Sequence, residues 1–345
     1  MHASSTTRTA LTLNTFAALL AAAGFLALPA HAQQAPAAKP VNAPQVVDAI
    51  QDVFGVIPGQ RRNHTKGTCA VGEFVGTKEA QAFSKAGLFS GQTIPVTARF
   101  SLAGGNAKAP DAVRSPRGMA LEFKMPDGRV QHMTMLNVPV FSASVPQTFY
   151  DALVAQKPDP ATGKPDPAKM DAFRASHPDA APLGKYLAAN NPPQSYANAA
   201  FFGIHAFKFT NTEGKVTLVK WRFVPQDGVK PLTDDEMKTA PASFLEDKLI
   251  ARTAQGPAKW DMIVTIGEAG DPDNNPTLTW PDGRKEFKAG TLSITKAMPQ
   301  PGAACEPINY DPLVMVEGIG PTNDPILLFR SPAYAVSFGK RLSKQ

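Results

Sequence analysis

The chain has 345 residues, of which 43% are apolar and 19% are charged, and its formal net charge is +6. This is enough apolar material for the core of one large domain or two smaller ones. The positive charges form no block and no stripe that alternates with aromatic residues, which disfavours nucleic-acid binding. Arginines placed singly along the chain are better explained by a compact anionic ligand that carries carboxylates.

Residues 1–32 have the organisation of a secretory signal peptide. Arg8 precedes an apolar stretch from about Leu11 to Leu28, and Ala30-His31-Ala32 follows as a small-x-small cleavage pattern. The stretch is rich in Ala and lies at the extreme N-terminus, which favours cleavage over retention as a membrane anchor. We therefore expect an exported, periplasmic protein without stable membrane association. Residues 33–44, rich in Ala, Pro and Gln, are expected to be a disordered leader.

The remaining residues, 45–345, are expected to form a single α+β domain. Apolar spacing and capping residues predict helices at about 46–54, 77–85, 148–154, 168–175, 183–189 and 241–254, the last with Pro241 near its first turn. β-rich and alternating segments predict strands at 96–101, 119–123, 130–136, 206–210, 216–223, 260–266 and 291–294. Successive hairpins with inserted helices favour an antiparallel β-barrel with helices on its outside.

The two cysteines leave one structural question open. Cys69 and Cys305 could pair in an oxidising compartment, but nothing in the sequence shows that they touch. The sequence has no CxxC, CxxCH or HExxH motif, so a zinc site and covalently attached c-type haem are both disfavoured.

Two short segments, far apart in the chain, combine residue types that are informative together. Residues 61–67 read Arg-Arg-Asn-His-Thr-Lys-Gly, and Arg330 stands four positions before Tyr334. Alone, His64 is more often a solvated or structurally bonded histidine, and Tyr334 a surface tyrosine. Further motifs accompany them in order: Arg99-Phe100-Ser101, residues 113–118 (Val-Arg-Ser-Pro-Arg-Gly), Asn137-x-Pro139-x-Phe141, residues 202–208 (Phe-Gly-Ile-His-Ala-Phe-Lys) and Arg341. From about residue 46 onward, the chain resembles the haem catalases, and most closely their short exported relatives, the catalase-related peroxidases.

The resemblance implies a haem b cofactor held between the two segments. Tyr334 would ligate the iron as a phenolate, which is the protein ligand of catalase haem. Arg330 would add a fixed positive charge beside the phenolate oxygen. On the other face, His64 would take a proton from the peroxide and return it to the leaving oxygen, and Ser101 would fix the tautomer of His64.

The resemblance also implies residues that hold the cofactor without reacting. Phe149 falls where the family stacks an aromatic ring on the porphyrin. Arg61, Arg99 and Arg341 would bind the two propionates. His205 is expected to be structural, because its segment lies away from the haem motifs. The methionines Met133 and Met135 are expected in the core rather than on iron.

Two departures from the full-length catalases bear on activity. Leu136 stands where the family has a distal asparagine, and Asn137 would point elsewhere on a strand unless a one-residue bulge restored it to the pocket. Asn137 is therefore kept as a candidate catalytic residue. The sequence also ends soon after Tyr334, without the long C-terminal helical region of the larger enzymes. We expect a monomer or homodimer with more open access for small organic electron donors.

These features predict a haem peroxidase that uses hydrogen peroxide or small organic hydroperoxides to oxidise organic electron donors, with weak catalase activity. One alternative is a true catalase, in which Leu136 is harmless. Another is a haem-binding protein without turnover, although such a protein has no need of His64 supported by Ser101. A third is rearrangement of fatty-acid hydroperoxides, which would require a lipid channel.

Overall fold

The structure is a computed structural model that describes residues 39–345. The expected signal peptide and residues 33–38 of the expected leader lie outside the described residues. Residues 40–345 form one compact unit. The leader was predicted too long, because helix α1 (Ala43–Phe54) begins at Ala43. Asn42 caps it, since the Asn42 side chain accepts from the Gln45 amide and the Gln45 side chain accepts from the Asn42 amide.

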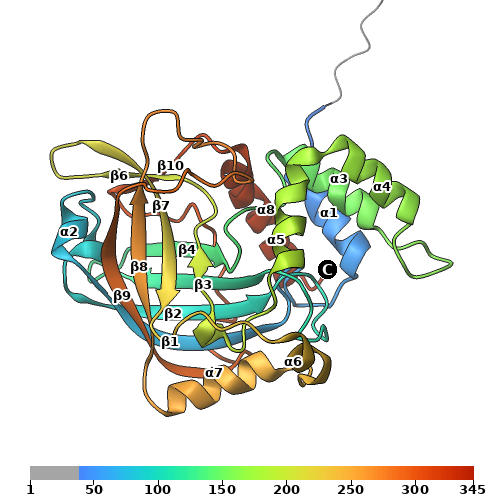
Figure 1. Ribbon diagram of the computed structural model, residues 1–345, viewed down its shortest axis with the longest axis horizontal. Coiled ribbons are helices and arrows are strands. Elements are labelled where there is room, and N and C mark those ends of the chain that lie inside the picture. Colours follow the sequence, from blue (N-terminus) through green and yellow to red (C-terminus); the bar gives the residue numbers. More distant parts are fainter. Residues whose placement is uncertain (1–38) are drawn as a thin grey trace, which may run out of the picture. The chain divides into compact units, whose positions relative to one another are not determined.

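Eight strands close into an antiparallel barrel (Figure 1). In chain order they are β1 (Gly67–Gly76), β2 (Thr93–Leu102), β3 (Arg117–Lys124), β4 (Val130–Leu136), β5 (Phe201–Phe202), β7 (Val216–Pro225), β8 (Ala258–Ile266) and β9 (Glu286–Pro299). Their order around the barrel is β7-β5-β4-β3-β2-β1-β9-β8, and pairing of β7 with β8 closes it. Two further strands, β6 (Phe207–Thr210) and β10 (Ile319–Pro321), extend from β7. The predicted antiparallel barrel is confirmed.

Aromatic side chains fill the barrel interior. Phe74 is fully buried, and its ring centre lies 5.4 Å from that of Phe123 and 6.5 Å from that of Phe223. Gly290 on β9 makes this packing possible, because a Cβ there would lie 2.1 Å from Phe74 Cζ. Met133 and Met135 belong to the same buried cluster, in keeping with the prediction that they are core residues.

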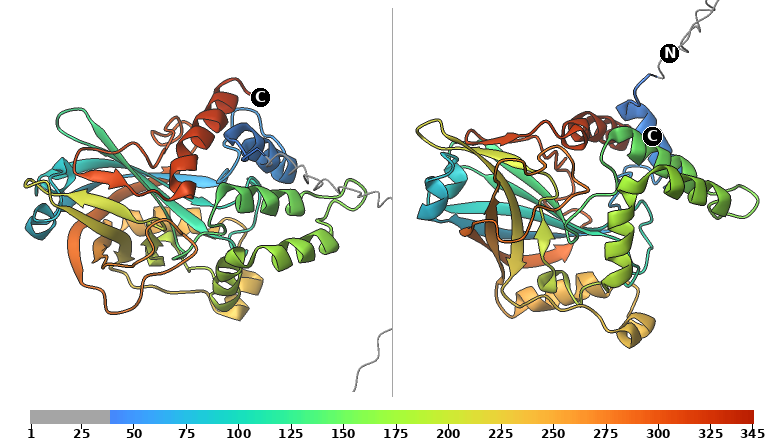
Figure 2. Two further views of the ribbon diagram at one scale, coloured as in Figure 1. Left: turned by 90° about the horizontal axis from the view of Figure 1, so that it is seen from above. Right: turned by 45° about the horizontal axis from the view of Figure 1, so that its top comes forward.

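Most helices gather on one side of the barrel (Figure 1). They are α1, α3 (Pro146–Gln156), α4 (Pro167–Ser176), α5 (Ala181–Ala189) and α8 (Pro325–Leu342), whereas α2 (Lys78–Gln81), α6 (Asp234–Thr239) and α7 (Phe244–Ala254) lie elsewhere around it. In Figure 2, α8 lies beside α1. Val46 and Ile50 of α1 pack with Leu153 of α3 and Phe329 of α8. This apolar cluster fixes α8 against the N-terminal helix.

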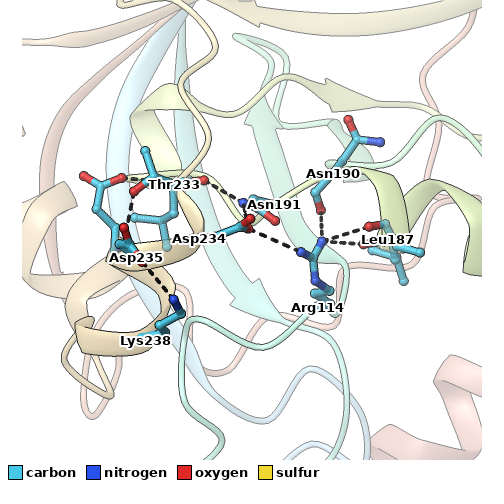
Figure 3. Close-up of polar contacts among 11 residues, drawn as sticks. Arg114, Leu187, Asn190, Asn191, Thr233, Asp234, Asp235 and Lys238 are labelled. Atoms are coloured by element: carbon cyan, nitrogen blue, oxygen red, sulfur yellow. Dashed lines mark hydrogen bonds and ion pairs between the residues drawn. The ribbon is translucent and has the colours of Figure 1, made fainter.

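Arg114 ties the loop after β2 to the end of α5 (Figure 3). Its Nη1 donates to the carbonyl oxygens of Leu187, Ala188 and Asn190 at 3.1 to 3.2 Å. These carbonyls lie at or just beyond the C-terminus of α5, where unpaired carbonyls and the helix dipole favour a cation. Its Nη2 lies 3.9 Å from Asp234 Oδ1 at the start of α6. This arginine of the 113–118 motif therefore serves the fold.

The structure differs from the predicted elements at several places. Strands β1, β5 and β10 and helices α6 and α8 were missed. The helix predicted over 241–254 begins only at Phe244, so Pro241 lies before it. Strand β9 runs over 14 residues, far beyond the predicted 291–294. Within residues 39–345, we find no helix with both the length and the apolar character needed to cross a membrane.

The question left open for the cysteines is answered by a disulfide. Cys69 on β1 is bonded to Cys305 in the loop after β9, with 5.5 Å between their Cα atoms. Both cysteines are fully buried. The bond fixes the loop at residues 305–308 against the barrel wall.

Candidate active site

A cavity of about 240 Å³ lies between strands β2–β4 and helices α1, α3 and α8. Seven of the predicted site residues line it together: Arg61, His64, Arg99, Ser101, Phe149, Arg330 and Tyr334. Asn137 and Arg341 are not among the lining residues. The structure thus brings the two segments at the ends of the sequence to one cavity.

His64 is held in an unusual backbone conformation. Its φ is +55°, in the left-handed region that non-glycine residues rarely adopt. Asn63 Oδ1 accepts from the His64 amide at 2.8 Å and from the Gly104 amide at 2.7 Å. Arg99 Nη2 donates to the His64 carbonyl at 2.7 Å. Strained backbone of this kind persists where the surroundings over-determine it, and is frequent at functional sites.

The imidazole of His64 is oriented and kept neutral by its surroundings. Its Nδ1 lies 2.9 Å from Ser101 Oγ. Desolvation, followed by the charges of Arg99 and Arg330, lowers the pKa of His64 to about 3. In the tautomer whose Nδ1–H donates to Ser101, Nε2 carries a free lone pair. His64 can therefore accept a proton at any pH near neutrality.

Two motif glycines leave room for these side chains. A Cβ at Gly118 would lie 2.8 Å from Ser101 Oγ and 3.2 Å from the His64 ring. A Cβ at Gly67 would lie 2.2 Å from Arg99 Nη2. Glycine at both positions is thus required by close packing around His64 and Arg99.

Tyr334 lies on α8 within a chain of hydrogen bonds. Arg330 Nη2 donates to the Tyr334 hydroxyl at 2.9 Å and to Thr134 Oγ1 at 2.7 Å. Arg330 Nη1 lies 3.1 Å from His205 Nε2, and His205 Nδ1 lies 2.7 Å from Asp324 Oδ2. With Nδ1–H donating to Asp324, Nε2 accepts from Arg330. Burial lowers the pKa of His205 to about 4, which keeps it able to accept.

The reason given for a structural His205 was therefore wrong. Its segment does not lie away from the haem motifs, since His205 contacts Arg330 directly. The motif spacing could not show this contact, because 125 positions separate the two residues. Asp324 also caps α8, because its Oδ1 accepts from the amides of Ile326 and Leu327.

The cavity gathers positive charge that no acidic side chain balances. Within the described residues 39–345, no Asp or Glu lines it. Burial, followed by repulsion from Arg99 and Arg341, lowers the pKa of Arg61 to about 9. Burial lowers the pKa of Arg99 to about 10. An anionic ligand would remove this penalty.

Arg61 and Arg341 both donate hydrogen bonds to backbone carbonyl oxygens of the loop at residues 305–308. Arg61 Nη1 and Arg341 Nη1 each donate to the Glu306 carbonyl at 3.1 Å. Arg61 Nη2 donates to Ile308, and Arg341 Nη2 donates to Pro307 at 2.8 Å. Arg341 and Arg61 therefore contact the same loop, but only Arg61 lines the cavity.

These residues fit a haem. A tyrosine on α8, a histidine on another segment, an apolar wall and buried arginines without acidic partners suit an iron porphyrin with two carboxylates. Phe149 on α3 contributes to the wall, and its ring centre lies 5.5 Å from that of Phe141. Among residues 39–345, no group of three or more His, Cys, Asp or Glu side chains is placed to hold a metal ion.

Asn137 does not reach this cavity. Strands β3 and β4 pair without a bulge up to Gly118 and Leu136, so the bulge that would turn Asn137 inward is not present. Asn137 Oδ1 accepts from the Arg117 amide at 2.6 Å, and the residue lines a separate cavity. Leu136 lines the central cavity instead. The candidate role of Asn137 in the pocket is therefore not supported by its position.

Many of the lining residues were not singled out from the sequence, among them Tyr310, Ile326 and Arg62. Tyr310 and Ile326 belong to no motif quoted above, so nothing in the sequence signalled them. Arg62 stands next to Arg61 and could have been recognised as a second cation at the same site.

Comparison with known proteins identifies the family. A sequence model of catalase matches residues 53–345. This chain belongs to the catalase family. The family is haem-dependent, and this catalase-family member is an oxidoreductase of the catalase-like haem class.

Two relatives of this catalase-family chain match it over almost their whole length. A catalase-related peroxidase of Synechococcus elongatus is 57% identical over 305 residues, which cover 88% of this chain and 90% of the relative. A catalase-related peroxidase of Mycolicibacterium paratuberculosis is 32% identical over 296 residues, covering 85% and 92% respectively.

Solved structures show the same fold. A bacterial catalase superposes with a TM-score of 0.75 and 28% identity, covering 83% of this chain and 58% of that one. Catalase A from Saccharomyces cerevisiae superposes with a TM-score of 0.76, covering 83% and 62%. Its identity is 23%, so it supports the fold alone.

Proposed function

We propose that this protein is a haem b-dependent peroxidase that reduces hydrogen peroxide or small organic hydroperoxides and oxidises small organic electron donors, with weak catalase activity. The observation that carries the proposal is one cavity lined by the His64–Ser101 pair and the Arg330–Tyr334 pair. Relatives named catalase-related peroxidases, which match over nearly their full length, add support.

Each residue has a role that its surroundings suit. Tyr334 would hold the iron as a phenolate, and the Arg330 guanidinium would keep a positive charge beside the phenolate oxygen. Phe149 would pack on the porphyrin, and Arg61, Arg99 and Arg341 would serve the carboxylate side of the site. The haem, when bound, supplies the redox centre at which the peroxide O–O bond is cleaved.

His64 would move the proton. Its Nε2 would take a proton from the bound peroxide and return it to the leaving oxygen, so that water departs from hydrogen peroxide and an alcohol from an organic hydroperoxide. Proton transfer by a positioned side chain typically contributes about 10²- to 10⁴-fold in rate. Ser101 would hold Nδ1 and fix the tautomer that leaves Nε2 free.

Leu136 favours peroxidase over catalase turnover. Catalase turnover requires a second peroxide to be held and oxidised at the same site, and Leu136 offers the cavity no hydrogen-bond donor where Asn137 is turned away. Organic molecules that give up electrons one at a time need no such hydrogen-bond donor in the cavity. A true catalase remains the alternative function, since His64 and Tyr334 would serve it equally.

The deciding experiment compares two products of one reaction. Purified protein with haem is given hydrogen peroxide with and without a dye donor, and oxygen release is measured against dye oxidation. The peroxidase proposal expects a high-spin ferric spectrum and dye oxidation that outruns oxygen release. Vigorous oxygen release would show a catalase. A His64→Ala variant that binds haem and oxidises dye as fast as wild type would show a haem-binding protein without a dedicated peroxide site.

We also propose that the protein acts in the periplasm as a monomer or homodimer. The signal-peptide pattern of residues 1–32 supports export, and a buried Cys69–Cys305 disulfide suits an oxidising compartment. Cell fractionation and light scattering of the purified protein test these two points separately.

A further inference from the structure

The central cavity is lined by one tyrosine besides Tyr334. All five tyrosines and three tryptophans of the chain lie within the described residues 39–345. Of these eight, Tyr310 and Tyr334 alone line the cavity. Among aromatic side chains, phenol and indole lose a single electron most readily. Tyr310 is therefore the oxidisable side chain that would lie against a ligand in the cavity without coordinating a metal.

Tyr310 is fixed in place and keeps its proton. Its side chain is buried and packs with Cys69 and Cys305 in one cluster. Its hydroxyl donates to the Thr97 carbonyl at 3.5 Å, which is long for a hydrogen bond between oxygens. Burial raises the pKa of Tyr310, so the phenol is protonated near neutral pH. Removal of an electron must therefore be accompanied by loss of this proton to a base.

A row of three paired residues runs beside Tyr310. Thr97 on β2 pairs with Glu122 on β3, and Glu122 pairs with His132 on β4, so the three side chains project from one face of the sheet. The Tyr310 hydroxyl lies at Thr97, whereas its ring centre lies 5.7 Å from that of His132. The phenol thus reaches across the middle residue of the row, which makes Glu122 a base beside it. Besides burial, the charge of Glu122 raises the pKa of Tyr310.

Glu122 can take up a proton without losing its partner. Its Oε2 lies 3.1 Å from His132 Nε2, and His132 Nδ1 lies 3.2 Å from the Asp311 carbonyl. Nδ1–H donates to that carbonyl, so one proton is shared between Nε2 and Oε2. Oε1 is left for a second proton, 3.7 Å from Nζ of the exposed Lys124. The pair therefore connects the buried phenol with groups near solvent.

We propose that Tyr310 is an internal electron donor to the cofactor. After a peroxide has been reduced at the haem, the phenol gives one electron to the oxidised cofactor and its proton to Glu122, which leaves a neutral tyrosyl radical. A small organic donor then returns one electron, and Glu122 returns the proton. The inference rests on the proposed function, which supplies the oxidant.

This step favours the oxidation of organic donors over the release of oxygen. Oxidation of a second peroxide to oxygen removes two electrons from it, so both oxidising equivalents must be available at the cofactor. Once Tyr310 has supplied one electron, the cofactor holds only one of them. Organic molecules that give up electrons one at a time can still react, one with the radical and one at the cofactor. Tyr310 thus acts in the same direction as Leu136.

The experiment uses Tyr310→Phe and Glu122→Gln, with Tyr196→Phe as a matched control. Tyr196 is a buried tyrosine that packs against Phe100 in the barrel core and does not line the cavity. Phenylalanine at position 310 keeps the ring and removes only the long hydrogen bond. Glutamine at position 122 can still accept from His132 Nε2. Circular dichroism and haem titration first establish that each variant folds and binds haem as wild type does.

The first arm detects the radical after peroxide. Haem-loaded protein is mixed with hydrogen peroxide without a donor, frozen within milliseconds and examined by electron paramagnetic resonance. Wild type and Tyr196→Phe should give a radical signal that narrows when the protein carries ring-deuterated tyrosine. Tyr310→Phe should lose this signal. Glu122→Gln should lower it about tenfold or more, because the proton loses its base.

The second arm needs no peroxide chemistry. The haem is replaced by zinc protoporphyrin, and a light flash in the presence of hexaammineruthenium(III) takes one electron from the porphyrin. Transient absorption then follows the recovery of the porphyrin and the rise of the tyrosyl radical. If Tyr310 is the internal donor, the radical appears in wild type and Tyr196→Phe, whereas Tyr310→Phe shows no radical and slower recovery.

The products give a third readout. When oxygen release is measured against dye oxidation, Tyr310→Phe should raise the ratio of oxygen to oxidised dye, and Tyr196→Phe should leave it unchanged. A radical that survives Tyr310→Phe, or no radical in wild type with zinc protoporphyrin, overturns the inference. An unchanged signal in Glu122→Gln overturns the role of Glu122 as the base. A wild-type protein that forms the Tyr310 radical with zinc protoporphyrin but oxidises no dye with peroxide would refute the proposed function alone.

Discussion

Removal of the Cys69–Cys305 disulfide should cost this protein much of its stability. The bond joins residues 236 positions apart, so it closes a very long loop in the unfolded chain. The chain-entropy relation for a loop of that size gives about 5 kcal/mol at 25 °C. In a protein of this size, each kcal/mol shifts the melting temperature by about 2 °C. We therefore expect a Cys69→Ala/Cys305→Ala variant to melt roughly 10 °C lower than the oxidised protein.

The bond should matter for the cofactor as well. Arg61 and Arg341 both donate to the Glu306 carbonyl, next to the disulfide. Release of this loop would let Arg61 leave the cavity, so we expect weaker haem binding in the double variant. Because both cysteines are fully buried, a reducing agent acts only after unfolding, and reduced wild type is best prepared by refolding in reductant.

The assay is thermal unfolding of the protein without cofactor, monitored by circular dichroism, in the presence and in the absence of reductant. Reductant should lower the melting temperature of refolded wild type and leave that of the double variant unchanged. A double variant that melts within about 2 °C of wild type would refute the loop-closure reasoning, since the expected entropic effect is several times larger.

Four further predictions concern the two sides of the cavity. Gly118→Ala should slow the reaction with peroxide at least about tenfold in stopped-flow measurements while the protein stays folded, because the new Cβ meets Ser101 Oγ and the His64 ring. The rate of that reaction should stay level from pH 8 to about pH 5, because the pKa of His64 is about 3; a fall centred near pH 6.5 would contradict the desolvated ring. The same lowered pKa means that His64 takes up a proton on unfolding below about pH 6.5, so it reduces stability as pH falls from there towards 3, which denaturant titration at several pH values can measure. Asp324→Ala should destabilise the protein by about 1 to 3 kcal/mol, because α8 loses its cap and His205 loses its partner; denaturant unfolding measures the loss, and Asp324→Asn should restore part of it.

Local sequence patterns predicted the helices and strands whose own residues favour the conformation that they adopt in the structure. Strand β4 was predicted with its bounds because its alternation and the turn before it are both local signals. Strand β1 was missed because glycines at both ends and in its middle weaken the strand pattern, although pairing with β2 and β9 holds it in place. Helix α8 was missed because Pro332 and Gly339 lie inside it. It forms through the Asp324 cap and packing on α1.

The candidate site was predictable to the extent that motifs preserve it. Motif order placed His64, Ser101 and Tyr334 correctly around one cavity. Contacts between distant segments were beyond reach, such as that of His205 with Arg330, because they depend on how the barrel closes. Asn137 depended on a single step of strand register, which reverses the side of the sheet that a side chain faces.

The central cavity can form only after nearly the whole chain has been synthesised. Arg61 donates to the carbonyl of Glu306, which lies 245 positions later in the chain. Strand β1 likewise cannot complete its pairing until β9 has been synthesised. The histidine side of the cavity is therefore synthesised early, whereas the helix with the tyrosine arrives last. Contacts so distant in sequence make folding slow, because the closure of long loops precedes the contacts that reward it. A partly made chain would hold His64 and Ser101 without Tyr334, so the proposed haem site is complete only once α8 has been made.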